Sequence, residues 1–96
     1  MGPGKAQLLG LIAETGSLSD AVRRMDTSYN RAWLHVKVMN ESFAEPLVNS
    51  TRGGTGKGGA SLTDTGRQVL ELCRRLEDEA AQAIAATRRT LAGLMK

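Results

Sequence analysis

The sequence predicts a mostly α-helical α+β fold with one small β-hairpin and a long helix at the C-terminal end. Apolar residues recur at helical spacing before residue 46 and again after residue 63. Between these stretches, two short β-prone segments flank a glycine-rich run. The chain of 96 residues is long enough for one domain with one modest core.

Two short helices joined by a tight turn are expected over residues 4–15 and 17–25. The first follows Pro3 and ends before Gly16, and proline near the start with glycine just past the end is typical of a helix. Its apolar residues are Leu8, Leu9, Leu11 and Ile12. Ser17 is the expected N-cap of the second helix, whose apolar positions are Leu18, Ala21, Val22 and Met25.

A third helix is expected over residues 28–42, with Ser28 as its cap. At about 100° per residue, one arc of this helix is expected to face the core: Tyr29, Ala32, Trp33, Val36, Met39, Asn40 and Phe43. The opposite arc is expected to face outward: Asn30, Arg31, Leu34, Lys37, Val38 and Glu41. The three aromatic residues, Tyr29, Trp33 and Phe43, are expected to be the large pieces of the core.

A hairpin with a glycine-rich tip is expected over residues 47–62, and one long helix over residues 64–95. The strands are Leu47 to Thr51 and Ala60 to Leu62, while the tip between them contains five glycines and one lysine. Thr63 is the expected cap of the last helix, which at ~1.5 Å per residue measures roughly 45 Å. Residues 1–66 thus form the predicted domain, and the long helix extends beyond it.

Helix, turn, second helix and a following hairpin is the order of elements in a winged helix-turn-helix. In that fold the third helix reads base edges mainly through its N-terminal residues, so the candidate DNA-binding residues begin with Ser28, Asn30 and Arg31. The further candidates are Leu34 and Lys37 on the outer arc and Arg52 and Lys57 in the hairpin. An ordinary cap followed by solvated residues remains the alternative for the first turn of the helix.

The charge distribution agrees with a nucleic-acid partner. The net charge is +3, and from Arg23 to Lys57 there are six basic residues against three acidic ones. The glycine run does not match a phosphate-binding loop, because Thr51 stands where the first glycine is required and Gly58 follows Lys57. A DNA-binding wing, with glycines that let the backbone approach closely, is therefore preferred to a nucleotide site or a plain linker.

Catalysis and metal binding are not expected. The chain has one histidine, His35, and one cysteine, Cys73, which cannot build a metal cluster, a histidine-based triad or an internal disulfide. We expect no catalytic residue, no metal site and no cofactor. The longest apolar run is too short to cross a bilayer, so a cytoplasmic protein without a membrane partner is expected.

Several segments resemble a known family. They are Thr15-Gly-Ser-Leu-Ser-Asp-Ala-Val22, Ser28-Tyr-Asn-Arg-Ala-Trp33, Met39-Asn40, Glu45-Pro-Leu-Val48, Gly53-Gly-Thr-Gly-Lys-Gly-Gly-Ala60 and Leu62-Thr-Asp-Thr-Gly66. Together they resemble the N-terminal domain of ModE-type molybdate-dependent transcriptional regulators, and more distantly the DNA-binding domain of LysR-type regulators. The resemblance implies a winged helix-turn-helix dimer that binds double-stranded DNA at a pseudo-palindromic operator.

The resemblance also implies an effector-binding part, because members of the family commonly carry C-terminal molybdate-binding domains. This chain ends at Lys96, so we expect a single-domain relative, a fragment, or a chain that works with a separate effector-sensing partner. A homodimer is expected through the apolar stripe of the last helix, with Leu76, Ile84, Leu91 and Leu94 as the candidate contacts. The alternative function is a winged-helix protein-interaction module or partner subunit, which the apolar Leu34 and Val38 would suit.

Overall fold

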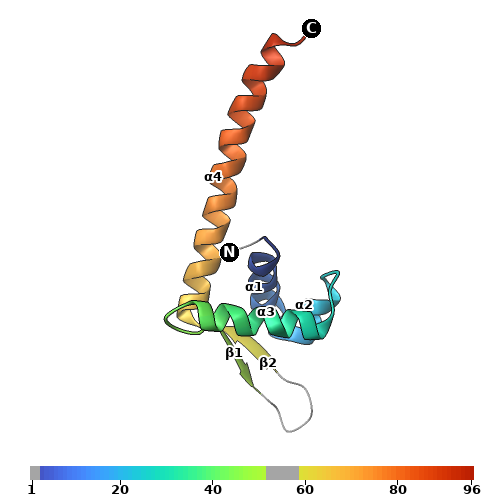
Figure 1. Ribbon diagram of the computed structural model, residues 1–96, viewed down its shortest axis with the longest axis vertical. Helices are drawn as coiled ribbons and strands as arrows, with labels where there is room; N and C mark the ends of the chain where they lie inside the picture. Colours follow the sequence, from blue (N-terminus) through green and yellow to red (C-terminus); the bar gives the residue numbers. More distant parts are fainter. Residues whose placement is uncertain (1–2, 52–58) are drawn as a thin grey trace.

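Four helices and one two-stranded hairpin make up the described part of the fold (Figure 1). The computed structural model describes residues 3–51 and 59–96. Its elements are α1 (Pro3–Thr15), α2 (Leu18–Arg23), α3 (Tyr29–Ser42), β1 (Val48–Thr51), β2 (Gly59–Leu62) and α4 (Asp64–Leu94). The α+β winged helix-turn-helix expected from the sequence is confirmed. The second helix is shorter than expected, since after Arg23 the chain continues as turns to Asp26.

The turn between α1 and α2 is determined by its own residues. Gly16 has a φ of +69°, a left-handed conformation that glycine adopts without steric cost, and its N–H donates to the Ile12 carbonyl at 2.8 Å. The Thr15 hydroxyl donates to the Leu11 carbonyl at 2.7 Å. These bonds satisfy carbonyl groups that the end of a helix leaves free, and α2 can therefore start at once.

All three expected N-caps are observed. The side-chain oxygens of Ser17, Ser28 and Thr63 accept hydrogen bonds from the backbone N–H groups of Asp20, Arg31 and Gly66 respectively. Each cap residue has an extended backbone, as a cap requires. The starts of α2, α3 and α4 are thus set by local sequence.

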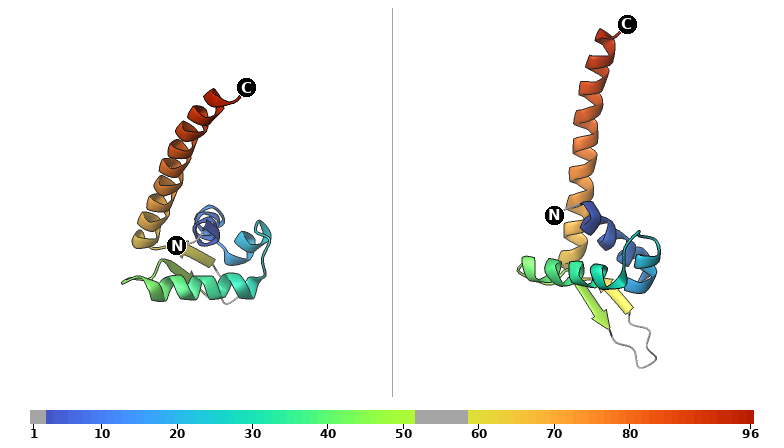
Figure 2. Two further views of the ribbon diagram at one scale, coloured as in Figure 1. Left: turned by 45° about the horizontal axis from the view of Figure 1, so that its top comes forward. Right: turned by 45° about the vertical axis from the view of Figure 1, so that its right-hand side comes forward.

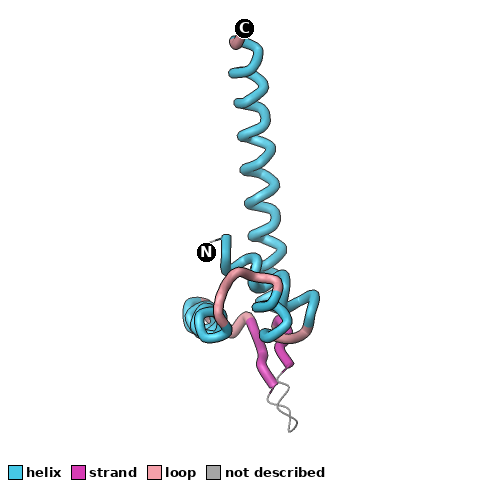
Figure 3. Tube along the Cα trace, turned by 90° about the vertical axis from the view of Figure 1, so that its right-hand side faces the viewer, coloured by secondary structure: helices cyan, strands magenta, loops and turns pink. Residues whose placement is uncertain are grey.

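The hairpin is antiparallel, with Val48 opposite Leu62 and Thr51 opposite Gly59. The Ala60 N–H donates to the Gly16 carbonyl at 2.9 Å, which attaches β2 to the turn between α1 and α2. The Thr63 N–H donates to the Leu47 carbonyl at 2.9 Å, which joins the two residues that flank the strands. Figure 3 shows that the strands and the free end of α4 point in opposite directions from the helical body.

The core is aliphatic, and the expectation that Tyr29, Trp33 and Phe43 are its large pieces was wrong. Its fully buried large side chains are Leu8, Leu9, Ile12, Met39 and Leu47, while Tyr29, Trp33 and Phe43 are 49%, 48% and 37% exposed. The physical reason is that α3 contacts the core through Ala32 and Met39, two turns apart on one face. The small side chain of Ala32 lets the helix pack closely on the core at that point, while Tyr29 and Trp33 lie to the side of this contact, toward the strands.

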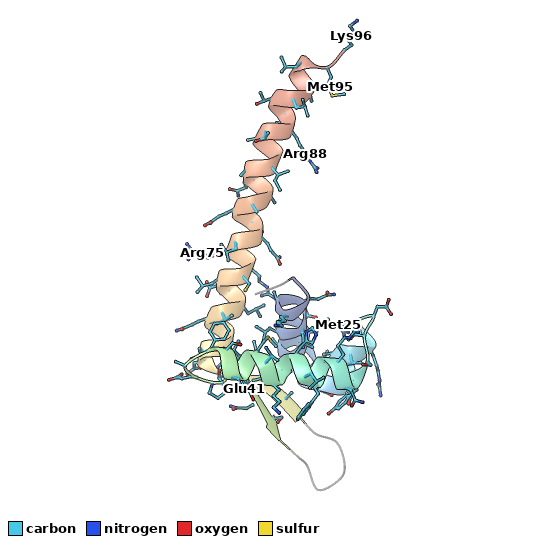
Figure 4. The ribbon with its side chains drawn as sticks, viewed as in Figure 1. Met25, Glu41, Arg75, Arg88, Met95 and Lys96 are labelled. Carbon is cyan, nitrogen blue, oxygen red and sulfur yellow. The ribbon has the colours of Figure 1, made fainter. Side chains whose placement is uncertain are left out.

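Only the first part of α4 belongs to this core. Leu70 is buried and Cys73 is half-buried, whereas every residue from Arg74 to Lys96 is exposed. The molecule measures 64 × 28 × 19 Å, and α4 accounts for its longest dimension. In Figure 4 the side chains of Arg75, Arg88 and Met95 project from α4 into open space.

Candidate nucleic-acid interface

Helix α3 lies across the molecule next to the hairpin and carries most of the candidate residues (Figure 2). Five of the predicted DNA-binding residues are exposed on α3 or at its cap: Ser28, Asn30, Arg31, Leu34 and Lys37. The other two, Arg52 and Lys57, lie outside the described residues. The interface described here is therefore α3 with the strands β1 and β2.

The cations of α3 differ from those at the end of α2 in their ion pairs. Arg23 forms an ion pair with Asp20 at 3.3 Å, and Arg24 forms one with Glu14 at 3.1 Å. Within residues 3–51 and 59–96, Arg31 and Lys37 form no ion pair. Since an exposed ion pair partly neutralises its cation, Arg31 and Lys37 are the cations of α3 that remain available to a phosphate.

The N-terminal end of α3 is exposed beside these cations. The Ser28 hydroxyl accepts from the Arg31 backbone N–H at 3.2 Å, which leaves its own proton free to donate. The N–H groups of the first helical turn also point out of the end of the helix, where the helix dipole favours an anion. This end can hold a phosphate while Asn30 and Arg31 extend from the same turn.

The two arcs expected for α3 are not separate in the structure. Tyr29 and Trp33 line a crevice of about 340 Å³ between α3 and the hairpin, and Asn30, expected on the opposite arc, lines it too. The Lys37 ammonium lies 5.8 Å from the centre of the Trp33 ring, in the range of a cation–π contact. Sequence analysis missed this crevice, and its only local signal was the spacing of Tyr29 and Trp33 by one helical turn.

Asn40 holds the start of the hairpin against α3. Its Oδ1 accepts from the backbone N–H groups of Leu47 at 2.8 Å and Val48 at 3.1 Å, and its Nδ2 donates to the Val48 carbonyl at 3.1 Å. The Asn40 side chain thus bonds the backbone of Leu47 and Val48 as a neighbouring strand would. We had expected Asn40 on the core arc from its position alone, without this role.

The predicted dimerisation residues lie on the projecting part of α4. Leu76, Ile84, Leu91 and Leu94 are all more than half exposed, and no other described element covers them. A stripe of large apolar side chains in water is unfavourable for an isolated chain.

In residues 3–51 and 59–96, no group of three or more His, Cys, Asp or Glu side chains is arranged to hold a metal ion. Among the same residues, no helix combines the length and the hydropathy that crossing a membrane requires.

Comparison with known proteins relates the chain to a set of regulators and molybdenum-binding proteins. It is 35% identical over 91 residues to the molybdenum-pterin-binding protein MopB of Rhodobacter capsulatus, covering 95% of this chain and 34% of that protein. It is 38% identical over 80 residues to the molybdenum transport protein ModE of Azotobacter vinelandii, covering 83% and 30%. It is 37% identical over 70 residues to the DNA-binding transcriptional dual regulator ModE of Escherichia coli strain K12, covering 73% and 27%.

The chain spans about a third of the length of these curated relatives. No protein-family model matches it. Among solved structures, the full-length LTTR LysG from Corynebacterium glutamicum with bound effector Arg is similar, with a TM-score of 0.73 at 21% identity, covering 98% of this chain and 30% of that one. At this identity the likeness is one of fold.

Proposed function

We propose that this chain, which is similar in sequence to the ModE-type transcriptional regulators, is a sequence-specific DNA-binding protein that acts in transcription regulation. In this proposal α3 enters the major groove, the hairpin lies over the neighbouring backbone or minor groove, and the protein works by binding and not by catalysis.

One observation carries the proposal: α3 offers an exposed N-terminal turn and two unpaired cations on the side of the molecule that also bears the hairpin. Asn30 and Arg31 are in the first turn of α3 and are exposed, where a recognition helix contacts base edges. An arginine can donate two hydrogen bonds to guanine and an asparagine can pair with adenine. Lys37, two turns along the helix, is placed for a phosphate.

The proposal includes a homodimer. The projecting half of α4 carries an apolar stripe that no described part of the same chain covers, and pairing with a second copy would bury it. Two copies of α3 related by a two-fold axis would contact two half-sites of a pseudo-palindrome, one helical turn of about 34 to 36 Å or a multiple of it apart. The residues proposed for this contact are Leu76, Ile84, Leu91 and Leu94.

A second candidate function is a protein-interaction module. Leu34 and Val38 are 53% and 45% exposed on the outer face of α3, and apolar residues there suit a protein partner. They equally suit the methyl group of a thymine in the major groove. Lys37 beside them favours the DNA interpretation, because protein interfaces are usually depleted of lysine.

A binding selection tests the proposal. The purified chain is incubated at physiological salt with a library of random duplexes, and bound duplexes are recovered and sequenced over several rounds. Enrichment of one motif, in two inverted copies, is the expected result. The double variant Asn30→Ala with Arg31→Ala serves as the control, and it should enrich no motif while retaining weak binding. A wild-type selection that enriches nothing would show that the chain does not read sequence.

A further inference from the structure

The crevice between α3 and the hairpin is not needed for the base and phosphate contacts proposed for α3. It is about 340 Å³ in volume, and its walls are aliphatic side chains of the core margin, such as Ile12 and Val36. Tyr29, Asn30 and Trp33 line it from α3, and Ser50 lines it from β1. Both Tyr29 and Trp33 are about half exposed, so the crevice is open to a ligand from outside.

The polar side chains among the residues that line the crevice are all able to donate a hydrogen bond. They are the Tyr29 hydroxyl, the Asn30 amide, the Trp33 indole N–H and the Ser50 hydroxyl. In the part of the chain that the structure describes, the side chains of Tyr29, Asn30 and Trp33 have no hydrogen-bond partner. No acidic residue lines the crevice, and Lys37 lies over the Trp33 ring at its border. Such a set favours a ligand that accepts hydrogen bonds and carries negative charge.

The position of the crevice says which ligand this is. The major and minor grooves of a duplex are separated by one sugar–phosphate strand. If α3 is in the major groove and the hairpin faces the neighbouring minor groove, the space between the two elements must contain that strand. We propose that the crevice is the seat of one phosphodiester of the bound DNA, with Trp33 and Tyr29 donating to its oxygens and packing against the deoxyribose. This inference rests on the proposed DNA-binding function.

Tyr29 and Trp33, which are both neutral, thereby differ in role from the residues that contact bases and from the cations that contact phosphates. Their contacts position the duplex and carry no base sequence, because the backbone is the same at every step. They also displace no counterion, since neither side chain is charged. Loss of such a contact is therefore distinguishable both from loss of a base contact and from loss of a cation.

Tryptophan fluorescence tests the proposal directly, because Trp33 is the only tryptophan in the chain. The full chain is titrated with the duplex recovered by selection and, at low salt, with an unrelated duplex of the same length. We expect the Trp33 emission to change on saturation with both duplexes. In parallel, Trp33→Phe keeps the ring but removes the N–H, and it should weaken binding about tenfold on both duplexes, with an unchanged dependence of affinity on salt.

Two further variants complete the experiment. Tyr29→Phe removes only a hydroxyl and should weaken binding of both duplexes in the same way, which keeps the test intact if Trp33→Phe is poorly folded. Phe43→Leu changes an exposed aromatic residue of the region after α3 that does not line the crevice, and it should bind as the wild type does. Circular dichroism on each variant verifies the fold.

The site of contact can be located on the DNA. Single phosphates of the selected duplex are replaced one at a time by uncharged methylphosphonates. At one position per half-site, the loss caused by Trp33→Phe should shrink to about twofold or less, because the acceptor is already impaired. An even loss at all positions would place Trp33 away from the backbone.

The outcomes separate the two proposals. In one outcome the selected duplex binds, the Trp33 emission is unchanged, and both Trp33→Phe and Tyr29→Phe bind within twofold of the wild type. The crevice then holds no phosphodiester, and the DNA-binding function stands. If Trp33→Phe affects only the selected duplex, Trp33 reads a base and the backbone assignment is wrong. If neither duplex binds, both the DNA-binding function and the placement of a phosphodiester in the crevice are refuted.

Discussion

Gly66, in the first turn of α4, is in contact with the backbone of the segment that leads into the hairpin. A Cβ added at this position would lie 2.1 Å from the Leu47 carbonyl oxygen and 3.0 Å from its carbon. Both atoms belong to a backbone that also accepts from the Thr63 N–H, so they cannot move aside without breaking that bond. The close approach, and not the backbone conformation, requires glycine here.

We therefore expect Gly66→Ala to lower the free energy of unfolding by about 1 to 3 kcal/mol, measured by urea denaturation. The matched control is Gly93→Ala, also in α4, where an added Cβ meets no atom within 4 Å and where alanine should stabilise the helix by up to about 1 kcal/mol. Equal unfolding midpoints for Gly66→Ala and the wild type would contradict the steric argument.

Asn40 is a second position where one side chain decides local structure. Its three hydrogen bonds satisfy backbone groups of Leu47 and Val48. Asn40→Ala leaves these groups without partners and should destabilise the fold by about 1 to 3 kcal/mol, while Asn40→Asp keeps the acceptor and should lose less.

Hydrogen exchange provides the specific measurement for Asn40. In Asn40→Ala, the amide protons of Leu47 and Val48 should exchange faster than those of the α1 core. Asn49→Ala, an exposed change in the neighbouring strand, should leave the exchange of both amides as it is in the wild type. A uniform increase over all amides would point to global destabilisation alone.

At the scale of the element, α3 combines two kinds of DNA contact that can be told apart. Arg31→Ala should weaken binding to the selected duplex by about 1 to 3 kcal/mol more than binding to random DNA, because a base-edge contact is lost. Lys37→Ala should weaken binding to both duplexes alike and reduce the slope of log affinity against log salt by about 1.

Fluorescence anisotropy of labelled duplexes over a series of salt concentrations measures both quantities. The pair of variants forms its own control, since each removes one positive charge from the same helix. Equal losses on selected and random DNA for Arg31→Ala would make Arg31 a phosphate contact. An unchanged salt slope for Lys37→Ala would mean that Lys37 contacts no phosphate.

At the scale of the whole molecule, the projecting half of α4 decides the assembly. Its apolar residues Ile84 and Leu91 are 52% and 59% exposed, and carboxylates at these positions would place two charges in the proposed interface. We expect light scattering to give a dimer for the wild type at micromolar concentration and a monomer for Ile84→Asp with Leu91→Asp.

The control for this experiment has the same change in net charge on the opposite side of the helix. Gln82→Asp adds one negative charge there and Arg89→Gln removes one positive charge, and this double variant should remain dimeric. A monomeric wild type, or a dimeric Ile84→Asp with Leu91→Asp, would place the interface elsewhere. The monomeric variant should also bind the selected duplex far more weakly, because it loses the simultaneous contact with two half-sites.

Local features of this protein were determined by the sequence alone. The caps Ser17, Ser28 and Thr63 bond to residues three positions further on, and Gly16 ends its helix through a bond to Ile12. These interactions depend on neighbouring residues and on the helical period, so a pattern along the chain is enough to predict them. The order of the elements, and with it the winged helix-turn-helix class, follows from the same local signals.

Only the tertiary structure decided which side chains are buried and which meet. The arcs of α3 correctly included Ala32 and Met39, yet the rings of Tyr29 and Trp33 are half exposed. They line a crevice with Ser50, which is 17 residues or more away along the chain. The contact of Gly66 with Leu47 is likewise long-range, and Asn40 bonds to residues seven and eight positions further along the chain. The physical reason is that burial depends on the distance between packed elements, and that distance is set by side chains on both of them.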